Sequence, residues 1–191
     1  MRALRLFGAV SPVSRRRWSM RERADGDRIR AFADALSRSA RAPARLYLVG
    51  GATAVVHGWR ASTVDIDIRL EPDSDDLLRA IARLKDELDV NVELASPPDF
   101  IPELPGWRDR SPWIFRAGRL DVHHFDLYSQ ALAKLERGFE HDLADVRAMA
   151  ARGLIDGSQA IAFLDAIDDQ LFRYPQIDAA GFRGRVLDVL G

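Results

Sequence analysis

The stretch from Leu46 to Leu70, LYLVGGATAVVHGWRASTVDIDIRL, constrains the fold of this chain more than any other segment. A short apolar run leads into a Gly-Gly pair, a helix-like segment of small residues, and a strand-like run that carries Asp65 and Asp67. Side chains alternate faces along a strand, so the two carboxylates point the same way and the apolar residues between and beside them, Val64 included, point into a core. The stretch therefore predicts a strand, a glycine turn, a helix and an acidic strand in direct succession.

The composition is that of an ordinary globular protein. The 191 residues are 47% hydrophobic and 30% charged, with a formal net charge of -1. There are no cysteines, which excludes disulfides and thiolate metal sites, so any metal must be held by carboxylate, imidazole or backbone oxygen ligands. No apolar run approaches the ~20 residues of a membrane-spanning helix, and we expect a cytoplasmic protein without a membrane partner.

The chain divides into three parts by pattern. Residues 1–23 contain the basic cluster Arg15–Trp18, which could contact nucleic acid but which we interpret as part of a disordered tail, with Met20 as an alternative start of translation. Residues 24–126 alternate helix and strand patterns and form the expected α/β core. Residues 127–191 are helical in pattern throughout.

Helices and strands follow from the periodicity of apolar residues. Helices are expected at 25–40, 52–59, 75–88, 129–138, 140–152, 158–169 and 179–190, and strands at 45–49, 64–70 and 90–94, with a hairpin over 113–125. A Pro-rich connection, residues 97–112, is expected to be partly ordered or to act as a lid, with Phe100, Ile101, Leu104 and Trp107 as anchors. The order predicts an α+β fold: a mixed sheet with flanking helices and a C-terminal helical bundle.

The Gly-Gly pair and the Asp pair suit a nucleotide bound with a metal ion. Gly50 and Gly51 permit close approach of the backbone to a ligand, and the following helix start offers N–H donors to a phosphate. Asp65 and Asp67 offer carboxylate ligands, and Mg²⁺ typically takes one or two carboxylates plus substrate phosphates. Exposed acids on an edge strand would serve equally well to prevent aggregation, so the Asp pair alone is weak evidence.

A third carboxylate would complete a two-metal arrangement. Asp121, in the strand-like LDVHHF, is the best candidate by its alternation with apolar neighbours. Glu93, in VNVEL, is the second candidate. Either could instead be a polar residue on the wet face of a half-covered sheet.

The segment GGATAVVHGWRASTVDIDI resembles the signature of the DNA-polymerase-β-like nucleotidyltransferase superfamily, and the resemblance covers about residues 46–149. The segment LDVHHFD is similar to the third-acid strand of small antibiotic and minimal nucleotidyltransferases, which favours Asp121 over Glu93. The segment ALAKLERGFEHDLADVRAM resembles the lysine-and-aspartate helix motif of the abortive-infection toxin nucleotidyltransferases. In this motif His141 stands where the family usually has lysine.

The resemblance implies catalytic roles for Lys134 and Asp142, with Arg137 and Asp145 as further members of the motif. A lysine suits a triphosphate because its ammonium is a compact charge, and Lys134 is one of only two lysines in a chain rich in arginine. A surface lysine and a first-turn helix partner are the plain alternatives for Lys134 and Asp142.

Two residues between the glycine helix and the Asp strand complete the expected nucleotide site. Arg60 could hold a phosphate bidentately or pair with an acid, and Thr63 lies beside it in sequence.

The function expected from the resemblance is a bacterial, Mg²⁺- or Mn²⁺-dependent nucleotidyltransferase. It would move a nucleoside monophosphate from an NTP to a hydroxyl of tRNA or a protein, as the toxin of a toxin–antitoxin pair. The alternative is a catalytically silent module of the same fold that binds a ligand or acts like an antitoxin. A sugar-nucleotide transferase using Asp-x-Asp with manganese is disfavoured, because the Gly-Gly helix start precedes the Asp pair.

Overall fold

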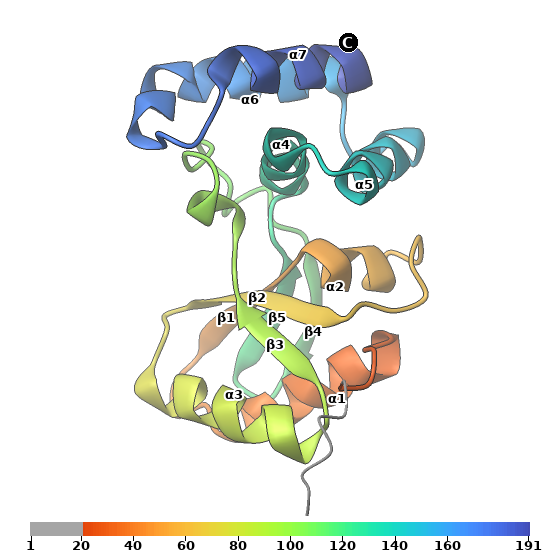
Figure 1. Ribbon diagram of the computed structural model, residues 1–191. Helices are drawn as coiled ribbons and strands as arrows, with labels where there is room; N and C mark the ends of the chain where they lie inside the picture. Colours follow the sequence, from red (N-terminus) through yellow and green to blue (C-terminus); the bar gives the residue numbers. More distant parts are fainter. Residues whose placement is uncertain (1–20) are drawn as a thin grey trace, which may run out of the picture.

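The computed structural model describes residues 21–191, so the interpretations of Arg15–Trp18 and Met20 concern residues outside this range. The described chain folds into layers: two helices, a five-stranded sheet, and a thick layer of C-terminal helices (Figure 1). Within residues 21–191, no helix is both long and apolar enough to cross a bilayer. The predicted α+β architecture is confirmed, and most elements begin and end within two residues of their predicted bounds.

The sheet is mixed, with the strand order β3-β2-β1-β5-β4. Its strands are β1 (Ala44–Val49), β2 (Asp65–Glu71), β3 (Asn91–Leu94), β4 (Trp113–Ala117) and β5 (Leu120–His124). The central strand β1 runs antiparallel to β2 and parallel to β5, and β2 runs parallel to the edge strand β3. The hairpin of β4 and β5 turns at Gly118, whose φ of 53° favours glycine.

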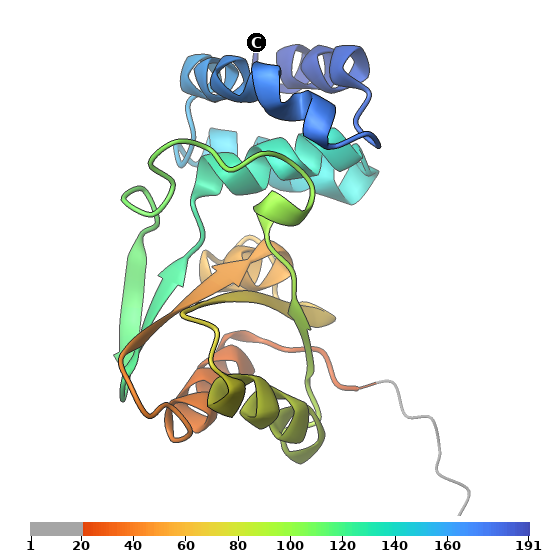
Figure 2. The same ribbon diagram turned by 90° about the vertical axis from the view of Figure 1, so that its left-hand side faces the viewer.

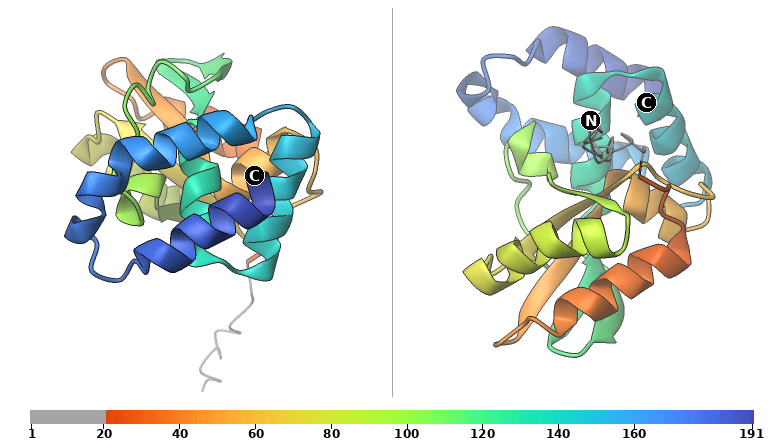
Figure 3. Two further views of the ribbon diagram at one scale, coloured as in Figure 1. Left: turned by 90° about the horizontal axis from the view of Figure 1, so that it is seen from above. Right: turned by 60° about the horizontal axis from the view of Figure 1, so that its bottom comes forward.

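The lower face of the sheet carries the main core. Helices α1 (Gly26–Ser37) and α3 (Asp75–Glu87) lie side by side against it (Figure 3). In β2 every second residue is buried, so Ile66 and Ile68 face this core while Asp65 and Asp67 face the other way. Val64 does not join the core as expected: β2 begins one residue later, and Val64 is 53% exposed.

The upper face of the sheet looks towards the C-terminal helices. Helix α2 (Gly50–Val56) follows β1 directly. Helices α4 (Leu127–Arg137) and α5 (Glu140–Ala151) form the next layer, and α6 (Gly157–Ile167), the 3₁₀ helix η2 (Asp168–Arg173) and α7 (Ala179–Leu190) cover them. A second hydrophobic cluster fills the space between these helices, separate from the core beneath the sheet.

The Pro-rich connection is ordered and packs against both the C-terminal helices and the upper face of the sheet. It begins with the 3₁₀ helix η1 (Pro97–Asp99), rises to the level of α4, crosses beside that helix and descends into β4 (Figure 2). The predicted anchors Ile101, Leu104 and Trp107 are at most 2% exposed. Trp107 packs against Tyr47 and Phe125 on the upper face of the sheet.

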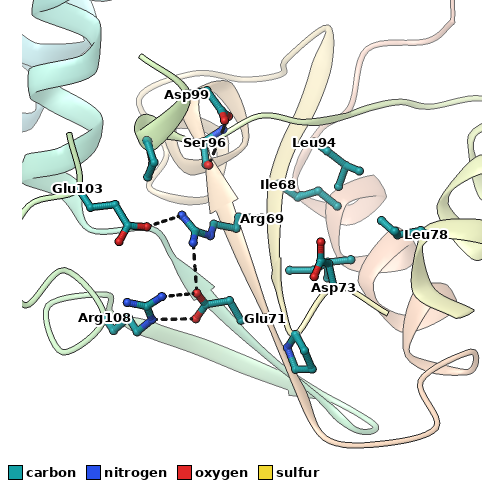
Figure 4. Close-up of a pocket in the computed structure, with 13 residues that line it drawn as sticks. Ile68, Arg69, Glu71, Asp73, Leu78, Leu94, Ser96, Asp99, Glu103 and Arg108 are labelled. Carbon is teal, nitrogen blue, oxygen red and sulfur yellow. Dashed lines mark hydrogen bonds and ion pairs between the residues drawn. The ribbon is translucent and has the colours of Figure 1, made fainter. Parts of the chain in front are cut away.

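Ion pairs fasten this connection to the end of β2. Glu71 accepts two hydrogen bonds from Arg108, at 2.7 and 3.1 Å, and Arg69 bridges Glu71 to Glu103 (Figure 4). Both guanidinium groups also lie over the Trp107 ring. The four charged residues line a hollow of about 770 Å³, which Leu94 at the end of the edge strand β3 also lines. The many contacts show a segment held in place.

Candidate functional site

Three carboxylates gather on the upper face of the sheet at the β2–β3 edge. Asp67 is opposite Glu93, and Asp65 is opposite Asn91, in the parallel register of the two strands. The Asn91 side-chain amide donates a hydrogen bond to Asp65. Because paired residues on parallel strands point to the same face, Asp65, Asp67 and Glu93 present three acidic side chains together.

Gly50 and Gly51 are required here because the side chains of Asp67 and Thr63 lie where a Cβ atom would be. Gly50 has a φ of 53°, and a Cβ placed on it would lie 2.7 Å from Asp67 Oδ2. A Cβ on Gly51 would overlap the Thr63 hydroxyl. The Gly50 N–H donates to Gln130 Oε1 at 2.8 Å, so this donor is already engaged within the protein. The glycines therefore bring helix α2 within contact of the Asp strand.

A buried cluster of charges on α4 and α5 faces the acids across a cavity. The Lys134 ammonium donates to Asp142 at 2.9 Å and to Asp145 at 2.7 Å. Arg137 donates twice to Asp142, at 2.9 and 3.1 Å. Lys134, Asp142 and Asp145 are each at most 5% exposed. The residues of the predicted helix motif thus form one hydrogen-bonded unit.

Arg60 extends this cluster to the loop between α2 and β2. Its guanidinium donates to both oxygens of Asp145, at 2.9 and 2.7 Å, and Trp59 Nε1 donates to the same carboxylate at 3.1 Å. Of the two roles considered for Arg60, the structure shows pairing with an acid, and the acid is buried. Asp145 thereby ties α4, α5 and the α2–β2 loop together. Counting Lys134 and the two arginines against the two aspartates, the cluster carries a net charge of +1.

Asp121 is not part of this site, which corrects its interpretation as the third acid. Asp121 pairs with Arg45 at the start of β1, whereas Asp67 pairs with Val49 at its end. The four intervening steps along the strand amount to roughly 13 Å. Asp121 instead accepts two hydrogen bonds from Arg116, at 2.7 and 2.9 Å, which lower the pKa of its carboxyl group. Glu93 stands in the place expected for the third acid.

The electrostatics of the two walls differ in sign. Burial and the neighbouring charges of Asp65 and Glu93 raise the pKa of Asp67 to about 6. Burial acts in the same direction on Asp142, but hydrogen bonds and charge from Lys134 and Arg137 outweigh it and lower the pKa of Asp142. Within residues 21–191 the acid cluster has no ion-pair partner, whereas the opposite wall is a hydrogen-bonded network with excess positive charge.

Between the two walls lies a cavity of about 350 Å³, which we call the acid cavity. Its lining comprises Arg23, Gly50, Gly51, Arg60, Thr63, Val64, Asp65, Asp67, Glu93, Lys134, Arg137, His141 and Asp142. A narrower hollow of about 120 Å³ shares five of these residues and continues towards Pro97 and Phe100. Of the site and motif residues predicted from the sequence, all but Asp121 and Asp145 line the acid cavity.

The donor set fits a divalent cation only in part. Among residues 21–191, no three His, Asp or Glu side chains converge into a complete metal site. Asp65 and Asp67 nevertheless offer adjacent carboxylate oxygens, and Mg²⁺ completes its shell with water and substrate phosphates. A cation would also relieve the repulsion that raises the pKa of Asp67. Asp65 and Asp67 therefore fit a cation that arrives with a phosphate ligand.

Two site residues had no signal in the sequence that could single them out. Asn91 orients Asp65, and Gln130 joins Gly50 to the Thr53 hydroxyl and the Phe125 carbonyl through its side-chain amide. Each belongs to an element with a clear apolar pattern, where one polar residue is unremarkable. The sequence showed that Glu93 alternates with apolar residues on its strand, but it did not show that β3 pairs with β2.

Comparison with known proteins gives one match. The model of the family described as "nucleotidyltransferase of unknown function" (DUF6036) matches residues 27–180, which include every residue of the acid cavity except Arg23. No curated protein and no solved structure matches the chain. The expectation of a nucleotidyltransferase family is confirmed, while the closer resemblance to the abortive-infection toxins stays a prediction.

Proposed function

We propose that this chain, which belongs to the family of nucleotidyltransferases of unknown function, moves a nucleoside monophosphate from a nucleoside triphosphate to a hydroxyl of an acceptor. The observation that carries the proposal is the acid cavity, in which three carboxylates of the sheet face Lys134 and Arg137. A negative and a positive wall lining one cavity suit a triphosphate with its cation, because such transfer depends on positioning and charge neutralisation.

In the proposed mechanism the acceptor oxygen bonds to the α-phosphorus, and the bond from that phosphorus to the β-phosphate oxygen breaks, releasing pyrophosphate. Glu93 is exposed beside Asp67 and takes the proton of the acceptor hydroxyl. The excess charge of the Lys134 cluster neutralises the leaving pyrophosphate. A bound Mg²⁺ or Mn²⁺, held by Asp65 and Asp67, would supply the remaining charge neutralisation.

The test is transfer of label from each α-labelled NTP, with Mg²⁺, to total tRNA and to cellular protein. We expect label on one acceptor class with the wild-type chain and none with Asp67→Asn. Asp121→Asn is the matched control, because it removes an acid of the same sheet face that lies outside the acid cavity. Equal labelling by the wild-type chain and Asp67→Asn would contradict the proposal.

The acceptor and the biological role extend the same proposal by resemblance. A tRNA or protein hydroxyl is the acceptor, and the enzyme is the toxin that an antitoxin protein holds in check. Induced expression in a bacterium tests this role. Growth arrest by the wild-type chain but not by Asp67→Asn supports it, and equal growth of both strains contradicts it.

A silent binding module is the competing function, and one observation favours it. The Lys134 ammonium is already bound by two buried carboxylates, which reduces its charge towards a phosphate. Saturable nucleotide binding without label transfer to tRNA or protein would decide for this alternative.

A further inference from the structure

Apolar and aromatic surface is exposed at the acid cavity, where a polar rim would be expected. Val64 is 53% exposed and lines the cavity, although its strand neighbours Ile66 and Ile68 are fully buried. Phe139 is 58% exposed and stacks on His141, which lines the same cavity. Val64 thus presents an apolar side chain to the cavity, and Phe139 packs against an imidazole that lines it.

The two rings form a flat and ordered surface. The Phe139 and His141 rings are nearly parallel, with an interplanar angle of 6° and centroids 5.7 Å apart. Phe139 is the N-cap residue of α5 and His141 lies in the first turn of that helix. The chain turns from α4 towards α5 at Gly138, whose φ of 70° favours glycine. Arg60 Nη2 donates to the His141 carbonyl at 3.5 Å, so the start of α5 is tied to the same cluster as Lys134.

The end of α4 is held from the other side as well. Arg185 of α7 donates to the carbonyl oxygens of Leu135 and Glu136, at 2.6 and 2.5 Å. These bonds satisfy carbonyls of the last helical turn and fix the point from which the chain turns towards Phe139. A surface held in this way loses little conformational entropy when a planar ligand stacks on it.

We propose that the paired rings of Phe139 and His141, with Val64 in the lining of the same cavity, form the stacking surface for the nucleobase of the donor nucleotide. This inference rests on the proposed function, which places the triphosphate between the acid cluster and Lys134. His141 and Asp67 line one cavity, so a single nucleotide can reach both. Phe139 and Val64 have no side-chain hydrogen-bonding group, so stacking accepts all four bases and favours the larger purine rings.

The experiment measures the Kd of each Mg·NTP and of Mg·tripolyphosphate, which has the charges of the donor but no base. The wild-type chain should bind NTP more tightly than tripolyphosphate. Phe139→Ala should weaken NTP binding about 10-fold, since stacking on an aromatic ring is worth ~1–3 kcal/mol per base, and should leave tripolyphosphate binding unchanged. Phe139→Trp should restore NTP binding, whereas Phe139→Leu, apolar but not flat, should not.

The matched control is Phe172→Ala. Phe172 is 78% exposed on η2 and lines neither the acid cavity nor the hollow that adjoins it. This variant should bind NTP like the wild-type chain, and thermal unfolding of each variant separates loss of binding from loss of fold.

Two results overturn the inference, and they differ in what they leave standing. If wild-type and Phe139→Ala bind NTP equally and more tightly than tripolyphosphate, the base stacks elsewhere, and the proposed transfer reaction is unaffected. If the wild-type chain binds neither NTP nor tripolyphosphate, the proposed function fails and the inference fails with it.

Discussion

Asp67 of β2 and Glu93 of β3 stand opposite each other in register, and both line one cavity with Lys134. The pairing puts two carboxylates on neighbouring strands of one face, with Asp65 two residues before Asp67. Each negative charge makes the next harder to ionise, so the cluster gains from a cationic ligand. The predictions below test this arrangement and the scaffold that holds it.

The identity of the third acid can be tested by substituting each of the two candidates in turn. Glu93→Gln should lower the rate of nucleotide transfer by 10²-fold or more, the usual contribution of a positioned proton acceptor. Asp121→Asn should change it less than twofold, because its carboxylate pairs with Arg116 at the far end of the sheet. Initial rates of label transfer provide the measurement, and the opposite order of effects would return Asp121 to the site.

The ion-pair cluster should be a large contributor to stability. Asp145→Ala removes the partner of buried Lys134 and of Arg60, and loss of one member of a buried pair costs about 3–5 kcal/mol. Denaturant unfolding measures this loss. The control is Asp165→Asn, which breaks an exposed pair with Arg183 at 2.8 Å and should cost at most about 1 kcal/mol. Equal losses in the two variants would show that the buried network stabilises the fold no more than a surface pair.

Gly50 should have two separable roles, one in the backbone and one in the site. Gly50→Ala and Gly58→Ala both place a side chain at positive φ, at a cost of roughly 1–2 kcal/mol each. A Cβ on Gly50 also collides with Asp67, whereas one on Gly58 meets nothing within 4 Å. Comparable losses of unfolding free energy are expected, with nucleotide binding lost only in Gly50→Ala. Unimpaired binding by Gly50→Ala would mean that the position of Asp67 is not critical.

The stability of the fold should fall in mild acid because of a buried histidine. His124 is 5% exposed, stacks on His57 at 4.1 Å, and has its pKa lowered to about 3 by burial and the neighbouring histidines. The unfolded chain binds a proton near pH 6.5, so the stability due to neutral His124 is full above that value and is lost as the pH falls towards 3.

The measurement is the unfolding free energy at pH 7.5 and pH 5.5. Over this interval the wild-type chain should lose roughly 1.4 kcal/mol more unfolding free energy than His124→Phe. Parallel pH profiles for the two proteins would contradict the buried neutral state of His124.

Much of the fold could be predicted from the sequence because local patterns suffice for it. The alternation through Asp65–Leu70 marked a half-buried strand, and the spacing of Leu77, Ile81 and Leu84 marked a helix with one apolar face. The same alternation placed Asp65 and Asp67 on one face. Val64 was misplaced, because the strand begins only at Asp65 and the burial of the residue before it depends on what packs against that position.

The sequence alone determined the elements and the shared face of the paired aspartates, since these depend on neighbours within a few residues. Tertiary structure decided the rest. The strand order brought Glu93 beside Asp67 and left Asp121 at the opposite end, a matter of which strands pair and in which direction. It also converted the cations Lys134 and Arg60 into members of one buried network, because two charges 74 residues apart meet at Asp145 only once α5 is packed beside the sheet.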